Sequence, residues 1–531
     1  MPTLDLHLEA DVVVLGSGFA GSLVSCALRR QGLRVAMIER QQHPRFAIGE
    51  SSTPLTNLLL EEFARRYDLP ELLPLAKWGS WQRDCSEVAC GLKRGFSFYQ
   101  HAWDRPFSDT SDHSHQLLVA ASPHDGIADT HWYRPDFDLH LLRAAISRGV
   151  TYRDRTEVHR FMPPQDGIVR LEGTRDGVPL RVNCRLVVDA TGSRGCLSRL
   201  LDCGEARFEG YAPTETVFAH FRGVGKVAEL SEFQSAETPP YPPDDAALHH
   251  VFEGGWIWVL PFNNGITSAG AALLPAWADR VRDVAGKPCW DRLLEHLPSV
   301  RRQFASAEPV TPMMTQSPMP YLSARCQGPG WVMLPSAMGF VDPLLSTGFP
   351  LVLFGLNRLV EAAAEHWGRE SLEPALANAT QRSVDELHRV SRLVRALYGA
   401  MGDFPRFATL TRLYFAAVSY AESARRLGHL DLAGDSFLLG SNPVFVAGMD
   451  ECLRLSSTLS VEELARRIDQ VIAPIDVAGL SRRDRRNWLP VDTADLFAAA
   501  AKLRSTPELL EASLRRSGFY PEADPPFASP S

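Results

Sequence analysis

Two apolar runs near the N-terminus, separated by a glycine turn and a helical stretch, indicate the fold class. Residues 11–15 (DVVVL) form a continuous β-branched run, which is typical of a strand buried on both faces of a parallel sheet. Residues 22–31 have the pattern of a helix, which Gly32 closes, and residues 33–38 (LRVAMI) form the next strand. The order strand, glycine turn, helix and strand predicts an α/β protein.

The pattern changes in the middle of the chain. A further apolar strand, residues 185–188, precedes a glycine turn, and residues 331–334 are strand-like before a helix that begins at about Thr347. Between about residues 205 and 325, strands and loops dominate. This stretch predicts a mostly β module inserted into the α/β unit.

Helical spacing returns after about residue 375. Residues 384–397 carry apolar side chains at helical intervals, and Ser460 to Glu463 is a capping box that opens another helix. The tail, residues 521–531, is rich in proline, and we expect it to be disordered.

Composition and charge narrow the class of protein. With 531 residues, 45% hydrophobic and 22% charged, the chain is an ordinary globular protein of two or three packed units. The net charge of -8 argues against nucleic acid and anionic membrane surfaces as partners. No apolar run reaches the roughly 20 residues that span a bilayer, and an early strand leaves no room for a signal peptide. We therefore expect a cytoplasmic protein without stable membrane insertion.

Cysteines and histidines do not form a recognisable metal site. The nine cysteines include no CxxC pair, and their odd number argues against a disulfide framework. Histidines gather in a loop-rich stretch, at positions 101, 113, 115, 124 and 131. The His-x-His at 113 and 115 is too little to hold a metal ion. We expect reduced thiols, hydrogen-bonded or solvated histidines, and no metal.

The glycine turn after the first strand has the spacing of a dinucleotide-binding motif. Gly16, Gly18 and Gly21 form GxGxxG between the strand and the helix, and Glu39 ends the second strand. Gly16 permits the tight turn, Gly18 lets the backbone approach a pyrophosphate, and Gly21 lets helix and strand pack closely. The phosphates would meet the helix N-terminus, and Glu39 would accept hydrogen bonds from the adenosine ribose.

Three later segments favour FAD over NAD. A polar turn at 45–54, a strand with a glycine turn at 187–195, and residues 339–348 before a helix together suit one long, extended cofactor. The residues that we expect to contact it are Gly16, Gly18, Phe19, Ala20, Gly21, Glu39, Arg40, Ile48, Gly49, Glu50, Ser51, Asp189, Thr191, Gly192 and Asp342.

Five segments together resemble the flavin-dependent halogenases, a branch of the FAD monooxygenase superfamily. The resemblance covers roughly residues 10 to 370, and the matching segments are GSGFAG (16–21), GESSTP (49–54), GLKRGFSF (91–98), GGWIWVLP (254–261) and FVDPLLSTG (340–348). It implies a Rossmann-like FAD-binding domain with an inserted, mostly β substrate module and a helical C-terminal region. The expected ranges are 1–80, 130–200 and 325–375 for the FAD-binding domain, 81–129 and 201–324 for the substrate module, and 376–520 for the helical region.

The resemblance also assigns roles to individual residues. Lys93 aligns with the catalytic lysine, which carries hypohalous acid made from FADH2, O2 and chloride or bromide to the substrate. An ammonium that hydrogen-bonds the hypohalous acid and a neutral amine that forms a haloamine are both open, and Arg94 and Lys77 are competing cations. The paired tryptophans of the family keep substrate away from the flavin, and a Ser-Thr-Gly turn holds the halide. The corresponding positions here are Trp256, Trp258 and Pro261, and Ser346, Thr347 and Gly348.

Two departures from the family pattern bear on substrate and cofactor. Relatives acting on tryptophan carry a glutamate before Ser-Thr-Gly, which helps the halogenated ring to lose its proton, and here that position is Leu345. A phenol needs less help, because its own oxygen stabilises the cationic intermediate, so we expect a phenolic substrate. Ser336 replaces the aspartate expected at the ribityl chain, which should weaken FAD binding.

The resemblance therefore predicts an FADH2-dependent halogenase of a small, electron-rich aromatic substrate. No second glycine-rich nucleotide motif is present in the sequence, so a separate flavin reductase should supply FADH2. An FAD-dependent aromatic hydroxylase is the enzymatic alternative, and a catalytically silent flavin-binding protein is the alternative from another class. The sequence leaves the oligomeric state open.

Overall fold

The computed structural model of the chain describes residues 6–209, 212–282 and 289–520. The proline-rich tail at 521–531 lies outside the described residues. Among the described residues, no helix is both long and apolar enough to cross a membrane.

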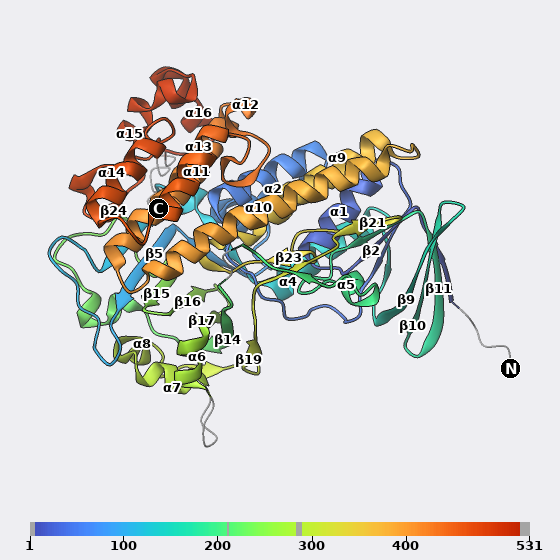
Figure 1. Cartoon of the computed structure of the whole chain (residues 1–531), viewed down its shortest axis with the longest axis horizontal. Coiled ribbons are helices and arrows are strands. Elements are labelled where there is room, and N and C mark those ends of the chain that lie inside the picture. Colours follow the sequence, from blue (N-terminus) through green and yellow to red (C-terminus); the bar gives the residue numbers. More distant parts are fainter. Residues whose placement is uncertain (1–5, 210–211, 283–288, 521–531) are drawn as a thin grey trace, which may run out of the picture.

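The expected α/β class is confirmed by a six-stranded sheet with parallel strands at its centre (Figure 1). Its order is β21-β22-β12-β2-β3-β8, with bounds β21 (Gln327–Gly328), β22 (Trp331–Met333), β12 (Leu186–Asp189), β2 (Val12–Leu15), β3 (Val35–Ile38) and β8 (Thr151–Arg153). All residues of β2, β3 and β12 are buried, which is what their continuous apolar runs require. The sheet is therefore assembled from three distant stretches of the chain.

Three helices pack together beside this sheet. The contacting helices are α1 (Phe19–Arg30), α4 (Arg134–Ser147) and α9 (Gly348–His366), and α2 (Pro54–Arg66) packs on α9. The glycine turn after β2 and the first turn of α9 lie at the same end of the sheet, where open α/β folds bind their ligands.

A nine-stranded sheet forms the second layer of the molecule. Its strands are β18 (Glu308–Pro309), β14 (Glu215–Arg222), β17 (Thr267–Leu273), β16 (Gly255–Pro261), β15 (Ala247–Phe252), β5 (Gly95–His101), β6 (Gln116–Ala120) and β24 (Trp488–Leu489), with β19 (Met314–Gln316) beside β14. The expectation of strands and loops over 205–325 missed three short helices, α6 (Pro275–Val281), α7 (Cys289–Glu295) and α8 (Pro298–Gln303). Their apolar stripes are too short for a helical period to stand out in the sequence.

A two-stranded antiparallel ribbon connects these layers. β4 (Cys90–Lys93) pairs with β7 (Asp129–Trp132), so that Lys93 lies opposite Asp129. An isolated bridge joins Ser51 to His131 on the same ribbon. The ribbon thus brings the turn that follows β3 next to the nine-stranded sheet.

Two smaller sheets complete the β structure. One contains β1 (Leu6–Glu9), β11 (Val178–Cys184), β10 (Ile168–Arg175) and β9 (Thr156–Gln165), and lies at one end of the molecule in Figure 1. The other contains β13 (Glu205–Ala206), β20 (Tyr321–Ser323) and β23 (Gly339–Phe340).

The C-terminal part of the chain is helical. Its first helix runs along the molecule beside α9, and the later helices lie at the end away from the four-stranded sheet (Figure 1). The helices are α10 (Leu372–Ala400), α11 (Phe404–Arg426), α12 (Leu430–Ala433), α13 (Pro443–Leu455), α14 (Val461–Ile472), α15 (Thr493–Ala498) and α16 (Pro507–Arg516). The predicted capping box is confirmed, since the Glu463 N–H donates to Ser460 Oγ at 3.2 Å and the Ser460 N–H donates to Glu463 Oε2 at 3.1 Å.

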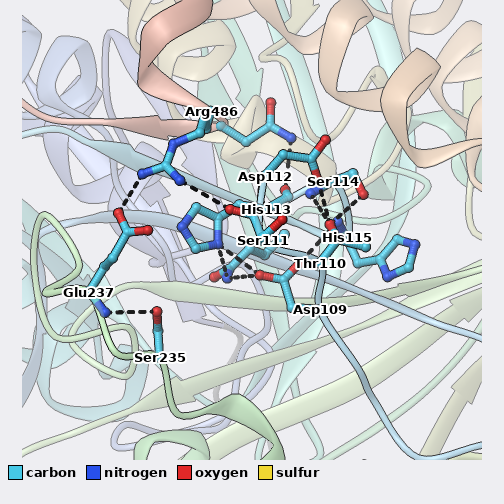
Figure 2. Close-up of polar contacts among 12 residues, drawn as sticks. Asp109, Thr110, Ser111, Asp112, His113, Ser114, His115, Ser235, Glu237 and Arg486 are labelled. Atoms are coloured by element: carbon cyan, nitrogen blue, oxygen red, sulfur yellow. Dashed lines mark hydrogen bonds and ion pairs between the residues drawn. The ribbon is translucent and has the colours of Figure 1, made fainter.

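A clasp, which we define as residues 109–116 and 486–489, ties this helical part to the large sheet. Figure 2 shows Arg486 between Glu237 and this loop, and its guanidinium donates to the Ser111 carbonyl at 3.0 Å. The His113 ring stacks on Trp488 with centroids 4.1 Å apart, and its Nδ1 lies 2.8 Å from Asp109 Oδ2. His113 thus has a packing role, and the described residues contain no cluster of three or more His, Cys, Asp or Glu suited to a metal ion.

Candidate functional site

The glycine turn after β2 is built so that only glycine fits at two of its positions. Gly16 has φ +93°, and a Cβ there would lie 2.7 Å from the Ala190 carbonyl oxygen. A Cβ on Gly21 would lie 2.0 Å from the Gly16 carbonyl oxygen, so the helix could not approach the strand. The N-terminus of α1 is therefore left open to a ligand at Gly18.

Two adjoining cavities run along the end of the six-stranded sheet. The Glu39 cavity is lined by Gly16, Glu39 and Arg40, and the Glu50 cavity is lined by Gly18 and Glu50. The residues that line both are Arg45, Thr191 and Ser193. Together they form one elongated space that passes the N-terminus of α1 at its middle, the arrangement that a dinucleotide needs.

The polar groups along this space fit FAD. The guanidinium groups of Arg45 and Arg134 lie 3.3 and 3.4 Å from the position of a Cβ on Gly18, where a pyrophosphate would sit. Burial opposes ionisation of Glu39, but the charge of Arg45 and two backbone N–H groups outweigh it and hold its pKa below the usual value. Glu50 Oε2 is buried at the wall of its cavity and has no hydrogen-bond partner among the described residues. A ligand with phosphates and hydrogen-bond donors would satisfy these groups.

Most of the predicted cofactor residues line this space. Those at the Glu50 cavity are Gly18, Phe19, Ala20, Ile48, Gly49, Glu50, Ser51, Thr191 and Gly192, and those at the Glu39 cavity are Gly16, Glu39, Arg40 and Thr191.

Two predicted carboxylates lie behind the cavity wall. Asp189 accepts hydrogen bonds from the Thr191 hydroxyl at 2.7 Å and the Leu197 N–H at 2.6 Å, so it fixes the second glycine turn. Asp342 accepts from the Tyr398 hydroxyl and the Leu344 N–H, each at 2.9 Å. Asp189 thus holds its own turn, and Asp342 ties its loop to α10.

Arg134 organises the loop that contains Glu50. Its guanidinium forms a bidentate pair with Asp138 at 2.8 and 2.9 Å, and donates to the Gly49 carbonyl at 2.9 Å. Arg45 and Arg134 both line the Glu50 cavity, and neither is among the cofactor contacts expected from the sequence.

Lys93 is fully buried, and its amine contacts two residues that line the Glu50 cavity. Its Nζ donates to Ser51 Oγ at 2.8 Å and to the Ser52 carbonyl at 2.5 Å, and lies 3.4 Å from Ser346 Oγ. The amine also lies 3.9 Å from the centroid of the Phe96 ring. Ser51 and Ser346 line the Glu50 cavity, whereas Phe96 lines a different one.

This second space, which we call the Tyr414 cavity, lies on the other side of Lys93. Aromatic and aliphatic side chains dominate its wall, among them Phe96, Val119, Tyr414, Phe415 and Val418. Helix α11 and the segment that follows the clasp supply much of the lining. Lys93 therefore stands between a polar, elongated cavity and an apolar one, a position suited to passing a small polar molecule from one to the other.

The competing cations do not share this position. Arg94 is ion-paired with Asp125 at 2.8 Å. Lys77 lines the Tyr414 cavity, but its Nζ donates to the Ser517 carbonyl at 2.8 Å.

Asp129, which the sequence analysis did not single out, lines the Tyr414 cavity beside Lys93. Burial raises the pKa of Asp129 to about 8, and the charge of Lys93 counteracts this. Burial likewise lowers the pKa of Lys93 to about 7, against the opposing charge of Asp129. Each group makes the charged form of the other less costly, so the two titrate as a pair. The signal available in the sequence was an acidic residue within a short strand. The structure shows that the other residues of this strand are buried.

The tryptophan pair lies at the Glu50 cavity. Trp256 and Trp258 are buried, line the Glu50 cavity and have ring centroids 5.7 Å apart. The Trp256 indole N–H donates to the Tyr398 hydroxyl at 3.0 Å, and the His249 ring lies 5.1 Å from Trp256. Pro261 ends the same strand, and its carbonyl oxygen lies 2.0 Å from where a Cβ on Gly91 would be. Trp256, Trp258 and His249 thus form an aromatic wall of this cavity.

The turn before α9 leaves the start of this helix without a side-chain cap. Neither Ser346 nor Thr347 makes a capping hydrogen bond. Thr347 has helical dihedral angles, φ −74° and ψ −17°, whereas a capping side chain needs an extended backbone. Ser346 has φ +55° and directs its hydroxyl to Lys93. Ser346 and Gly348 line the Glu50 cavity, and Thr347 is buried beside them.

Both departures from the family pattern lie at these cavities. Leu345 is fully buried, and its carbonyl oxygen accepts a hydrogen bond from the Tyr414 hydroxyl at 2.7 Å. Ser336 has φ +69° and lines the Glu50 cavity. The glutamate and the aspartate of the family pattern are thus replaced by groups without charge.

Comparisons with known proteins agree on one family. Residues 11–337, more than half of the chain, match the family described as FAD dependent oxidoreductase. Monodechloroaminopyrrolnitrin halogenase PrnC of Pseudomonas fluorescens is 29% identical over 76% of this chain and 70% of its own length. Tetracycline 7-halogenase of Kitasatospora aureofaciens is 32% identical over 64% of this chain and 60% of its own length. The crystal structure of halogenase PltM in complex with phloroglucinol and FAD has a TM-score of 0.78 and 25% identity, over 90% of this chain and 99% of that one.

Proposed function

Since the chain belongs to the FAD-dependent oxidoreductases and, within them, to the flavin-dependent halogenases, we propose that it halogenates an electron-rich phenol with Lys93 as the delivering residue. The observation that carries this proposal is the buried Lys93 amine between the Glu50 and Tyr414 cavities. Bound as FADH2, the cofactor supplies the two electrons that let O2 oxidise chloride or bromide to hypohalous acid.

The residues around the cofactor space have binding roles in this proposal. Glu39 would hold the ribose, Arg45 and the N-terminus of α1 the pyrophosphate, and the turn at 346–348 the halide. Trp256 and Trp258 would keep the aromatic substrate out of the Glu50 cavity. The Lys93 ammonium would hydrogen-bond the small, neutral hypohalous acid, which passes where the larger substrate does not.

A phenolic substrate is supported from two directions. The apolar, aromatic lining of the Tyr414 cavity suits a ring, and no glutamate is present at Leu345 to assist a less activated arene. PltM has been crystallised with phloroglucinol, a phenol, although only a quarter of its residues are identical to this chain.

Replacement of Lys93 by alanine tests the proposed function. The variant should bind FAD normally, because Lys93 itself lines neither cavity of the cofactor space, but should lose at least about 100-fold of its halogenation rate. Flavin fluorescence measures binding, and mass spectrometry of phloroglucinol incubated with FAD, NADH, a flavin reductase and bromide measures product. Lys226→Ala, which removes an exposed lysine, is the matched control and should keep full activity.

The alternatives give different outcomes in this assay. An aromatic hydroxylase would form a hydroxylated product in both the wild-type protein and Lys93→Ala. A silent flavin-binding protein would form no product at all. Either result would remove the halogenase assignment for this chain.

A further inference from the structure

Asp129 carries a carboxylate oxygen that nothing in the described chain satisfies. The side chain is buried, and Asn57 Nδ2 donates to its Oδ1 at 3.0 Å, while Oδ2 has no hydrogen-bond partner. The residue lines the Tyr414 cavity and lies directly opposite Lys93 in the β4–β7 ribbon. A buried, unpaired carboxylate oxygen is costly, so a ligand in this cavity is its natural partner.

The other polar groups around this cavity are already paired with one another. On α11, the Arg426 guanidinium donates to Glu422 at 2.7 Å. The Tyr414 hydroxyl donates to the Leu345 carbonyl, and Lys77 donates to the Ser517 carbonyl. Among the described residues that line this cavity, Asp129 Oδ2 is the one buried side-chain polar atom without a hydrogen-bond partner, and it lies beside the residue that delivers the halogen.

We propose that Asp129 is a second catalytic residue, which accepts the phenolic proton of the substrate while Lys93 holds the hypohalous acid. This inference rests on the proposed function, and it names the proton acceptor of that reaction. Asp129 thereby supplies, from β7, the base that Leu345 does not supply from the turn before α9.

The step balances with groups that the proposed function already contains. The ring carbon forms its bond to the halogen as the oxygen–halogen bond of hypohalous acid breaks. The departing hydroxide takes a proton from the Lys93 ammonium and leaves as water, and the phenolic proton moves to the Asp129 carboxylate. The Lys93 amine takes the ring proton of the resulting dienone, and the Asp129 carboxyl returns its proton to the ring oxygen, which restores the phenol and both side chains. The halogen is reduced by two electrons and the ring is oxidised by two.

The electrostatics of the pair suit this exchange. Burial raises the pKa of Asp129 to about 8, which brings it nearer to that of a phenol than an ordinary carboxyl would be. The reactive pair carries one proton in total, bound to Lys93. Because burial raises the pKa of Asp129 and lowers that of Lys93, this form is the minor one of the two singly protonated forms, and neither the fully protonated nor the fully deprotonated pair is active. The rate should therefore pass through a maximum near neutral pH and fall on both sides.

Asp129→Asn, assayed with phenols of different acidity, tests the inference. With a phenol that is protonated at the assay pH, the variant should be at least about 100-fold slower than the wild-type protein. With a fluorinated phenol that is already ionised, no proton needs an acceptor, and the two proteins should differ by less than about threefold. A purely structural role would not depend on the acidity of the substrate.

The pH profile is an independent readout. The groups that face Asp129 are Lys93 on β4, Asn57 on α2, and Tyr414, Glu422 and Arg426 on α11, with Lys77 at the same cavity. Without Asp129, the halogenation rate should no longer fall on the acidic side of its maximum. The basic limb should move to lower pH, because the carboxylate no longer raises the pKa of Lys93.

Asp244→Asn is the matched control. Burial also raises the pKa of Asp244, but this carboxylate accepts the N–H groups of Val227 and Ala228 in the substrate module and lines neither cavity. It should keep the wild-type rate and pH profile. An equal loss by Asp129→Asn with both classes of phenol, or an unchanged profile, would overturn the inference while leaving the halogenase assignment intact. A wild-type protein that halogenates no phenol would overturn both.

Discussion

At the scale of single residues, the site depends on a buried amine, although removing an ammonium group from water costs much free energy. Lys93 is fully buried, and its ammonium is compensated by Ser51, the Ser52 carbonyl and the Phe96 ring. Burial lowers its pKa to about 7, so both the ammonium and the amine are accessible near neutral pH. The resemblance identified this residue, whereas Asp129 became visible only through the register of β4 and β7.

Gly91 is the residue that lets this ribbon approach the tryptophan strand. A Cβ at this position would lie 2.0 Å from the Pro261 carbonyl oxygen and 3.0 Å from the His131 ring. We predict that Gly91→Ala displaces β4, lowers the halogenation rate and destabilises the fold by about 1–3 kcal/mol. Urea denaturation and the product assay measure the two effects.

Gly399 provides a control for this substitution. It lies in α10, and a Cβ there would meet nothing within 4 Å. Gly399→Ala should be neutral or stabilising by up to about 1 kcal/mol. If Gly91→Ala behaved in the same way, close contact between the ribbon and Pro261 would not be what positions Lys93.

At the scale of elements, the turn before α9 joins the two cavities through its backbone. Leu345 and Ser346 are consecutive non-glycine residues in the left-handed region, with φ +63° and +55°. Such residues cost on the order of 1–3 kcal/mol each and persist where the surroundings hold them. Here the Tyr414 hydroxyl holds the Leu345 carbonyl, and Ser346 faces Lys93. The strain is stored at the point where the halide is expected.

A pair of substitutions separates the hydroxyl of Ser346 from its backbone conformation. Ser346→Ala removes the hydroxyl and keeps the strained backbone, whereas Ser346→Gly removes the hydroxyl and relieves the strain. If the hydroxyl supports halide binding beside Lys93, both variants should raise the apparent KM for bromide by about tenfold, as expected for one hydrogen bond to a charged group. Steady-state kinetics at varied bromide measures this. A defect in Ser346→Ala that is absent in Ser346→Gly would instead assign the effect to backbone strain.

At the scale of the whole molecule, the two cavities belong to different parts of the chain. The Glu50 cavity is formed mainly by the FAD-type fold, including the turns after β2, β3 and β12. The Tyr414 cavity is closed by α11 and by the segment after the clasp, both in the C-terminal part. The clasp shown in Figure 2 fixes that segment to β6, whose Val119 and Ala120 line the same cavity. Cofactor and substrate would thus be held by separate units that meet at Lys93.

This division predicts how electrons reach the site. Because the sequence has no second glycine-rich nucleotide motif, NADH and FAD alone should give no halogenated product. Adding a separate flavin reductase should give product, and chemically reduced FADH2 should replace that reductase. Mass spectrometry of the reaction mixture measures both. Turnover with NADH in the absence of a reductase would contradict the prediction.

The sequence alone determined the parts of the protein that depend on neighbouring residues. The glycine spacing at 16–21, the buried runs of β2 and β3 and the capping box at Ser460 are local patterns, and each is present in the structure. Only the tertiary structure decided what lies on either side of Lys93, because the walls of the two cavities come from segments far apart in the chain. Strand register brought Asp129 opposite the amine, and helix packing placed Tyr414 beside it. The uncapped start of α9 followed from the same packing, since the Ser346 hydroxyl meets Lys93 instead of its own helix.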